Sequence, residues 1–204
     1  MQYDYLQDAI PNLLITSLEE SKQVQVTTWE RLFDLLKRTG KDNVKFIDRD
    51  LGYELCEIDG VDAIVLGSFT KVGNIFATYA NVLEVKTKRL LKSVSSRGEG
   101  VDSILKTQID ELSKVISSGI GQEEKVSAAK MSPIKDVTTT SMEAYNVFLI
   151  GREAFEKWYY ADARRLLERA IELDPEFAMA YIYLGQAELG LNDVTRATAA
   201  FEKS

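Results

Sequence analysis

The chain has 204 residues, of which 45% are hydrophobic and 28% are charged, an ordinary composition for a globular protein. Its net charge of −7 disfavours general nucleic-acid binding, because an acidic surface repels phosphate groups. The lack of histidine excludes Ser-His and Cys-His nucleophile pairs and the commonest metal ligand. Cys56 is the one cysteine, so an intrachain disulfide is excluded. Its acidic neighbours favour a small buried side chain over a reactive thiol.

No apolar run is long enough to cross a membrane, and the first residues lack the basic and apolar regions of a signal peptide. The sequence therefore predicts a soluble segment without membrane insertion. Its compartment is left open: the alternatives are a membrane-anchored or envelope parent protein in bacteria and a cytoplasmic one.

The first sixty residues predict mainly helices. Residues 4–21 carry leucine and isoleucine at helical spacing. The alternation in Val24–Thr27 predicts a short strand, which would lie at an unprotected sheet edge. Thr27 and Glu30 have the spacing of a capping box, which predicts the start of a second helix. A third helix is expected over about residues 47–58.

The period then changes to that of strands. Residues 63–66, 76–85 and 90–94 are rich in β-branched, aromatic and alternating residues. Gly73-Asn74 is typical of a hairpin turn, so the three strands should form an antiparallel meander. A loop over residues 95–100 should lead into a helix.

The second half predicts a helical region after a linker. The helix that follows the loop should cover about residues 101–118. Residues 119–140 lack apolar periodicity, and we interpret residues 120–140 as a linker. Thr140 and Glu143 have capping-box spacing, and everything from residue 141 onward has a helical pattern. The sequence thus predicts an α+β protein with a small antiparallel sheet over residues 1–119 and an all-α region over residues 141–204.

A 34-residue offset relates two parts of this helical region. Gly151 aligns with Gly185, Ala163 with Ala197, and Leu167 with Phe201. We expect the glycines and alanines to let the two helices of a pair approach closely, and Leu167 and Phe201 to fill the space between neighbouring pairs. Asp174-Pro175 should be the joint between the repeats, because proline cannot continue the preceding helix.

This pattern resembles the tetratricopeptide repeat, a helix-turn-helix unit. The first repeat would cover residues 144–177, and the second would begin at residue 178 and be incomplete, which suggests a fragment. Val147 departs from the family's usual Trp, and Ala154 and Glu188 depart from its usual aromatic residue. The residues on the family pattern are Ile150, Gly151, Ala163, Leu167, Ala170, Pro175, Tyr181, Leu184, Gly185, Ala197 and Phe201.

The N-terminal part is similar to the TolB amino-terminal-like and CsgG-like domains of bacterial envelopes. The resemblance lies in Gly60–Gly73 and Ala80–Thr87. Lys88 replaces the usual turn glycine, and the family's first strand is not found before Tyr5. Such a domain often precedes tetratricopeptide repeats in bacterial signalling proteins, so the resemblance implies a signalling or envelope context.

The family's groove supplies the candidate binding surface. In tetratricopeptide repeats the first helix of each pair lines the concave face, so protein or peptide partners are implied. Alternatively, some of these side chains pack against the linker or the N-terminal domain. The lysine and asparagine clamp for C-terminal carboxylates is not matched, so chaperone tails are not expected partners. The matching positions are Tyr145, Phe148, Arg152, Phe155, Glu156, Met179, Ile182, Gln186 and Leu189.

Evidence for chemistry is weak. The acids Asp48, Asp50, Glu54, Glu57 and Asp59 could bind a divalent cation or serve a histidine-free enzyme, but the solvated face of a helix explains them equally simply. Gly98-Glu99-Gly100 lacks the third glycine of a phosphate-binding turn. We therefore expect no catalytic residues, metal or cofactor.

The sequence favours a non-catalytic interaction or scaffolding module that binds a peptide or protein segment in the repeat groove. The alternative is a small-ligand sensor that relays its occupancy through the repeats. A homo-oligomer through the sheet edge, or through the uncapped end of the repeats, is compatible with either function.

Overall fold

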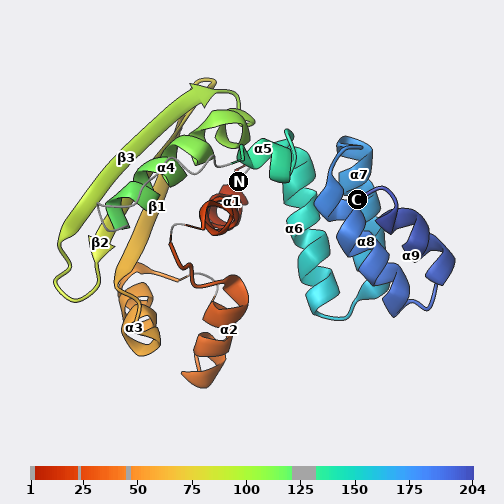
Figure 1. The fold of residues 1–204 in the computed structure, drawn as a ribbon, viewed down its shortest axis with the longest axis horizontal. Coiled ribbons are helices and arrows are strands. Elements are labelled where there is room, and N and C mark those ends of the chain that lie inside the picture. Colours follow the sequence, from red (N-terminus) through yellow and green to blue (C-terminus); the bar gives the residue numbers. More distant parts are fainter. Residues whose placement is uncertain (1–2, 23, 45–46, 121–131) are drawn as a thin grey trace. The chain divides into compact units, whose positions relative to one another are not determined.

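The computed structural model describes residues 3–22, 24–44, 47–120 and 132–204, and it confirms the α+β fold class. The chain divides into two compact units, which Figure 1 shows. We call residues 10–131 the sheet unit, and residues 1–9 together with 132–204 the helical unit. The domain boundaries expected from the sequence stay a prediction. The elements in chain order are α1 (Leu6–Ser21), α2 (Trp29–Arg38), α3 (Arg49–Asp59), β1 (Ala63–Val72), β2 (Ile75–Glu84), β3 (Leu90–Glu99), η1 (Ile104–Gln108), α4 (Ile109–Ile120), α5 (Ile134–Val137), α6 (Met142–Glu156), α7 (Tyr160–Leu173), α8 (Ala178–Gly190) and α9 (Val194–Phe201).

The strand predicted at Val24–Thr27 is wrong, because these residues are irregular. Alternation alone cannot make a strand without a neighbour to pair with. The predicted capping box is also one residue too early. Thr28 caps α2 by accepting a hydrogen bond from the Arg31 backbone N–H at 3.4 Å. The hydroxyl of Thr27 instead donates to Asp59 at the end of α3.

Helices α2 and α3 contact each other through a small apolar cluster. Leu35, Leu36 and Leu55 are buried in it, with Leu51 at its border. This cluster gives the two helices a core of their own.

The sheet is an antiparallel meander in the order β1-β2-β3, as the sequence predicts. Gly73, with φ of 59°, and Asn74 form the two-residue turn between the first two strands. From Ile75 to Val82, every second residue of β2 is buried, and the residues between them are exposed or half-buried. Helix α4 contacts β2 and β3, and Figure 1 shows it lying along one face of the sheet.

The loop predicted at residues 95–100 is mostly strand, since β3 continues to Glu99. Gly98-Glu99-Gly100 is therefore not a turn at a helix start: Gly98 pairs with Phe76 in the sheet. A side chain at position 98 would come within 2.4 Å of the Ser103 side chain, which explains the glycine. Serine and glycine disfavour strands only weakly, and here the pairing with β2 prevails.

The helix after the sheet begins with a π-helical turn, η1. Gln108 in this turn is fully buried, and its amide is hydrogen-bonded on both sides. It accepts from the Thr78 hydroxyl at 2.8 Å, and it donates to Ser103 Oγ at 2.8 Å and to the Phe76 carbonyl at 3.2 Å. These bonds tie the turn to β2, as a buried amide requires.

Candidate functional site: the helical hairpins

The helical unit contains the two hairpins that the 34-residue offset predicts. Helix α6 contacts α7, α7 contacts α8, α8 contacts α9, and α6 also contacts α8. Helix α9 begins 34 residues after α7, at residues 194 and 160, and α8 ends 34 residues after α6, at residues 190 and 156. The break at Asp174-Pro175 separates α7 from α8, as expected.

The start of the first hairpin lies one residue later than predicted. Ser141, not Thr140, caps α6 by accepting a hydrogen bond from the Ala144 backbone N–H at 3.2 Å. Thr139, two residues before this cap, has another role: its hydroxyl donates to the Asp174 carboxylate, at the joint between the hairpins. Adjacent hydroxyl residues make such a one-residue ambiguity unavoidable from sequence.

The turns inside the two hairpins have the same backbone conformation. Trp158 and Asn192, 34 residues apart, both have a left-handed φ, of 65° and 62°. The N–H of Tyr159 donates to the Ala154 carbonyl, and the N–H of Asp193 donates to the Glu188 carbonyl, both at 2.9 Å. This hydrogen bond closes the C-terminus of a helix in the Schellman manner. The repeat is therefore present in the backbone as well as in the side-chain pattern.

The two pattern glycines face the second helix of their own hairpin. A side chain at Gly151 would come within 3.1 Å of Leu167, and one at Gly185 within 2.5 Å of Phe201. Leu167 and Phe201 thus contact these glycines within each hairpin, and the expectation that they also fill the space between hairpins stays a prediction. Ala163 and Ala197 are buried, as close helix approach requires.

The pattern position before each glycine is not equivalent in the two hairpins. Leu184 is 9% exposed, whereas Ile150 is 46% exposed. The offset therefore predicts the backbone frame better than it predicts the surroundings of every side chain.

Two of the predicted groove residues are interior side chains. Tyr145 and Phe148 are buried, and their rings contact the ring of Phe177, with a centroid distance of 4.9 Å for Phe148. Phe148 also meets Tyr183 edge-on at 5.4 Å. Desolvation in this cluster raises the pKa of Tyr145 well above its ordinary value. These two side chains pack within the helical unit.

The equivalent positions on α8 are accessible. Ile182 is 39% exposed and Leu189 is 48% exposed, and Gln186 between them is exposed. With the half-buried Met179 they recur at helical spacing, so they share one face of α8. This row of four residues is called the α8 stripe below.

The remaining predicted groove residues lie on α6. Arg152 and Glu156 form an ion pair with 3.4 Å between Nε and Oε1, and the Glu156 side chain is about half exposed. Phe155 is half-buried against Tyr160 and Tyr183. Because α6 contacts α8, these residues supply charge and aromatic surface on the helix beside the α8 stripe. Whether any of the predicted groove residues binds a partner stays a prediction.

A buried carboxylate lies between the second helices of both hairpins. The side chain of Glu188 on α8 is 1% exposed. It forms an ion pair with Arg196 of α9, with 2.8 Å between Nε and Oε1. A longer ion pair, with 3.8 Å between Nη1 and Oε2, joins it to Arg164 of α7. Sequence reasoning noted Glu188 only as a departure from an aromatic position. The sequence carries no local signal for this pairing, because the two arginines lie on other helices.

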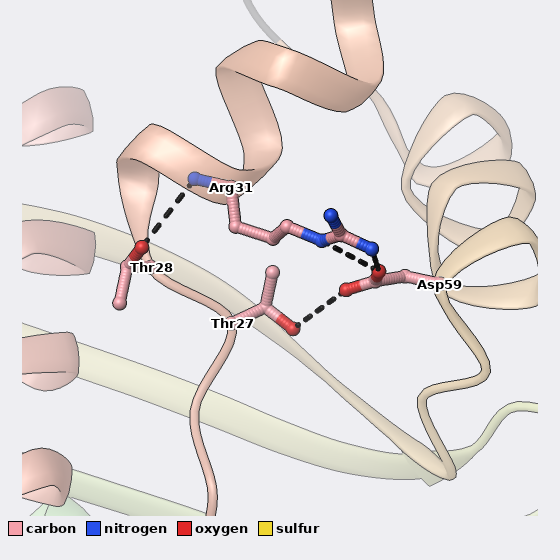
Figure 2. Close-up of polar contacts among 4 residues, drawn as sticks. All are labelled: Thr27, Thr28, Arg31 and Asp59. Carbon is pink, nitrogen blue, oxygen red and sulfur yellow. Dashed lines mark hydrogen bonds and ion pairs between the residues drawn. The ribbon is translucent and has the colours of Figure 1, made fainter.

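Three of the five acids in the cluster of the sheet unit have structural partners. Asp48 caps α3 by accepting from the Leu51 N–H at 2.9 Å, and Glu54 pairs with Lys41 at 2.5 Å. Figure 2 shows Asp59 accepting hydrogen bonds from the Arg31 guanidinium and from the Thr27 hydroxyl. The hydrogen bond between Arg31 and Asp59, and secondarily the charge of Asp59, raise the pKa of Arg31. No group of three or more metal-ligating side chains occurs among the described residues.

Cys56 lies on α3 beside this cluster and is a half-buried free thiol. Desolvation, and secondarily the charge of Asp59, raises the pKa of the Cys56 thiol. A raised pKa keeps the sulfur protonated and poorly nucleophilic near neutral pH.

A shallow hollow opens at the third strand of the sheet unit. Its volume is about 360 Å³, and Tyr79, Arg97 and Glu111 contribute to its lining. The Glu111 carboxylate accepts a hydrogen bond from Ser96 at 2.5 Å. The hollow is open to solvent and offers one cationic and one anionic side chain.

Comparisons with known proteins give one partial similarity. The Hsp70-Hsp90 organizing protein of Triticum aestivum is 48% identical over 44 residues, which are 22% of this chain and 8% of that protein. This similarity weakly supports the tetratricopeptide part of the predicted resemblance, and nothing found supports the TolB-like and CsgG-like part. No family model matches the chain, and no solved structure matches it. In the described residues, every helix is too short or too polar to cross a membrane.

Proposed function

We propose that this chain is a non-catalytic protein-interaction module that binds a peptide or protein segment along the α8 stripe. Hot-spot side chains must be accessible before binding and well packed afterwards. Ile182 and Leu189 meet the first condition, being 39% and 48% exposed on one helix face. This exposure is the observation that carries the proposal.

A charged pair lies on α6, the helix that contacts α8. Arg152 and Glu156 of α6 are engaged with each other at 3.4 Å, and an incoming carboxylate could replace the glutamate as the partner of the guanidinium. The partner segment we propose therefore presents two apolar side chains to Ile182 and Leu189 and an acidic group to Arg152.

The biological setting is also a proposal. The resemblance noted in the sequence implies a scaffolding part of a bacterial signalling or envelope protein. The similar wheat protein is named as an organizer of Hsp70 and Hsp90. That role does not fit this chain, because Phe148 and Arg152 occupy clamp positions that would need other residues to hold a C-terminal carboxylate.

A peptide selection would test the proposal. A random phage-displayed peptide library is selected on the chain, and the enriched peptides are measured by isothermal titration calorimetry. Ile182→Glu combined with Leu189→Glu should weaken binding at least about tenfold, the effect of losing one hot spot. Val194→Glu is the matched control, because Val194 is 65% exposed and lies on α9. Equal binding by the double variant and the control would refute the α8 assignment.

The hollow at Tyr79, Arg97 and Glu111 favours a second candidate, a small-ligand sensor. A ligand that binds only the folded chain raises its melting temperature. A thermal-shift screen of nucleotides, sugars and divalent cations, repeated with Arg97→Ala, would test it. A shift abolished by that substitution would support the sensor, and no shift with any compound would count against it.

A further inference from the structure

The outer edge of β1 is a row of backbone groups whose direction is fixed by the sheet register. The Val85 N–H donates to the Asp62 carbonyl at 2.8 Å, so residues 62 and 85 form a hydrogen-bonded pair. Such pairs alternate along an antiparallel ladder, so even-numbered residues of β1 bond to β2. The N–H and C=O groups of Ala63, Val65, Gly67 and Phe69 therefore point away from β2.

This edge is unprotected within the described part of the sheet unit. The sheet order places β1 at the border, and no described backbone group donates to or accepts from these four residues. Residues 63–70 carry no charged side chain, whereas the opposite border strand, β3, contains Lys92, Arg97 and Glu99. Charges on an edge strand discourage pairing with another chain, so the two edges differ in the protection they have.

The outward row is symmetric about Gly67. In an antiparallel pair of two β1 strands centred there, Val65 lies opposite Phe69 of the second copy, and Gly67 lies opposite its own equivalent. Lys71 lies opposite Ala63, so no like charges meet. Val65 and Phe69 are half-buried, and they share a sheet face with the buried Val82 and Thr78, their partners on β2. Pairing would cover the exposed part of both side chains.

We propose that β1 pairs with β1 of a second copy of this chain, antiparallel and centred on Gly67. The two three-stranded sheets would join into one continuous sheet, and the contact would be isologous, as in most soluble dimers. The proposal concerns the sheet unit and is independent of the peptide-binding role of the helical unit.

Proline at position 67 tests the proposal. The Gly67 N–H points outward, so Gly67→Pro removes no bond to β2, and proline is tolerated on an edge strand with this orientation. A Cβ at position 67 would meet the Tyr79 carbonyl oxygen at an ordinary 3.6 Å. Gly67→Ala is the matched control, because it adds the Cβ and keeps the N–H.

Light scattering coupled to size exclusion would give the mass of the full chain from low to high micromolar concentration. We expect the native chain and Gly67→Ala to rise from 22.9 kDa toward twice that mass, and Gly67→Pro to stay at 22.9 kDa with an unchanged far-ultraviolet spectrum. A native chain that is monomeric throughout, or a Gly67→Pro variant that dimerises like Gly67→Ala, would overturn the proposal.

Hydrogen exchange of the native chain keeps the test decisive if the proline variant does not fold. The amides of Val65, Gly67 and Phe69 should exchange faster in dilute than in concentrated solution. The amides of Leu66 and Ser68, which bond to β2, should be slow in both. Exchange at the three outward amides that does not depend on concentration would also overturn the proposal.

Discussion

The two helical hairpins share a backbone and differ in what their side chains do. Phe148 and Ile182 are 34 residues apart, yet Phe148 is fully buried and Ile182 is 39% exposed. Ala154 and Glu188 are similarly related, and the side chain of Glu188 is a buried carboxyl group that contacts arginine. The turn bonds of the hairpins coincide residue for residue. Small residues and turn geometry thus fix the frame of a repeat, and the side chains on that frame are free to diverge.

The largest expected difference is between Phe148 and Ile182. Phe148→Ala leaves a cavity among the rings of Tyr145, Phe177 and Tyr183, so we expect it to lower the free energy of unfolding by about 3–5 kcal/mol. Ile182→Ala should change it by less than about 0.5 kcal/mol, as at other exposed positions. Urea unfolding followed by circular dichroism would measure both. Similar losses would mean that the hairpins are packed alike.

Substitutions of Glu188 test the second difference between the hairpins, the buried carboxyl group at the position that aligns with Ala154. Glu188→Ala removes the shared partner of Arg196 and Arg164. Because these arginines are about half and a third exposed, they can be rehydrated, and we expect a loss of about 1–3 kcal/mol. Glu188→Leu should recover most of this loss, since apolar side chains often replace buried ion pairs without cost. If Glu188→Leu is as unstable as Glu188→Ala, the charge itself is required.

Tyr145, which aligns with the half-buried Met179, should make the free energy of unfolding depend on pH. Its pKa is raised in the folded chain, so the unfolded chain releases this proton first as the pH rises. Above the ordinary pKa of about 10, stability should therefore fall by about 1.4 kcal/mol per pH unit from this group. Tyr145→Phe should remove that slope, as measured by urea unfolding between pH 9 and pH 11. An unchanged slope would show that Tyr145 does not ionise on unfolding.

The smallest effect concerns the turns. Trp158 has a left-handed φ, which is unfavourable for a bulky residue. Asn192 has the same conformation, and asparagine tolerates it better. Trp158→Asn should raise the free energy of unfolding by up to about 1 kcal/mol, because it relieves backbone strain. The loss of the Trp158–Tyr160 ring contact should offset part of this gain. The reverse exchange, Asn192→Trp, should be destabilising. Thermal unfolding of both variants, with opposite shifts expected, would compare the turns.

Much of the frame could be predicted from the sequence. Alternation and the Gly73-Asn74 turn identified the strands, and the 34-residue offset identified the hairpins. The caps were misplaced by one residue, because Thr27 and Thr28 are both competent caps and only a distant partner, Asp59, distinguishes them. The strand at Val24–Thr27 failed for a similar reason: its pattern was local, and no described strand pairs with it.

The candidate site was less predictable than the frame. Spacing placed Phe148 and Ile182 on equivalent faces, but it could not show that Phe177 and Tyr183 fill the space beside Phe148. The pairing of Glu188 with arginines on two other helices likewise depends on tertiary contacts. Sequence periodicity reports which side of a helix a residue occupies, and burial depends on what packs against that side.

The π-helical turn at Ile104–Gln108 has a consequence for anyone aligning this chain with a relative. The Ile109 N–H donates to the Ile104 carbonyl, five residues back, so the turn holds one residue more than an α-helical turn. Deleting a residue between Ser103 and Gln108 would rotate the residues before the deletion by about 100° relative to α4, and Ser103 would no longer lie beside the Gln108 amide. A homologue with a single-residue gap at this point should therefore need a hydrogen-bond partner other than Ser103 for a buried glutamine at position 108.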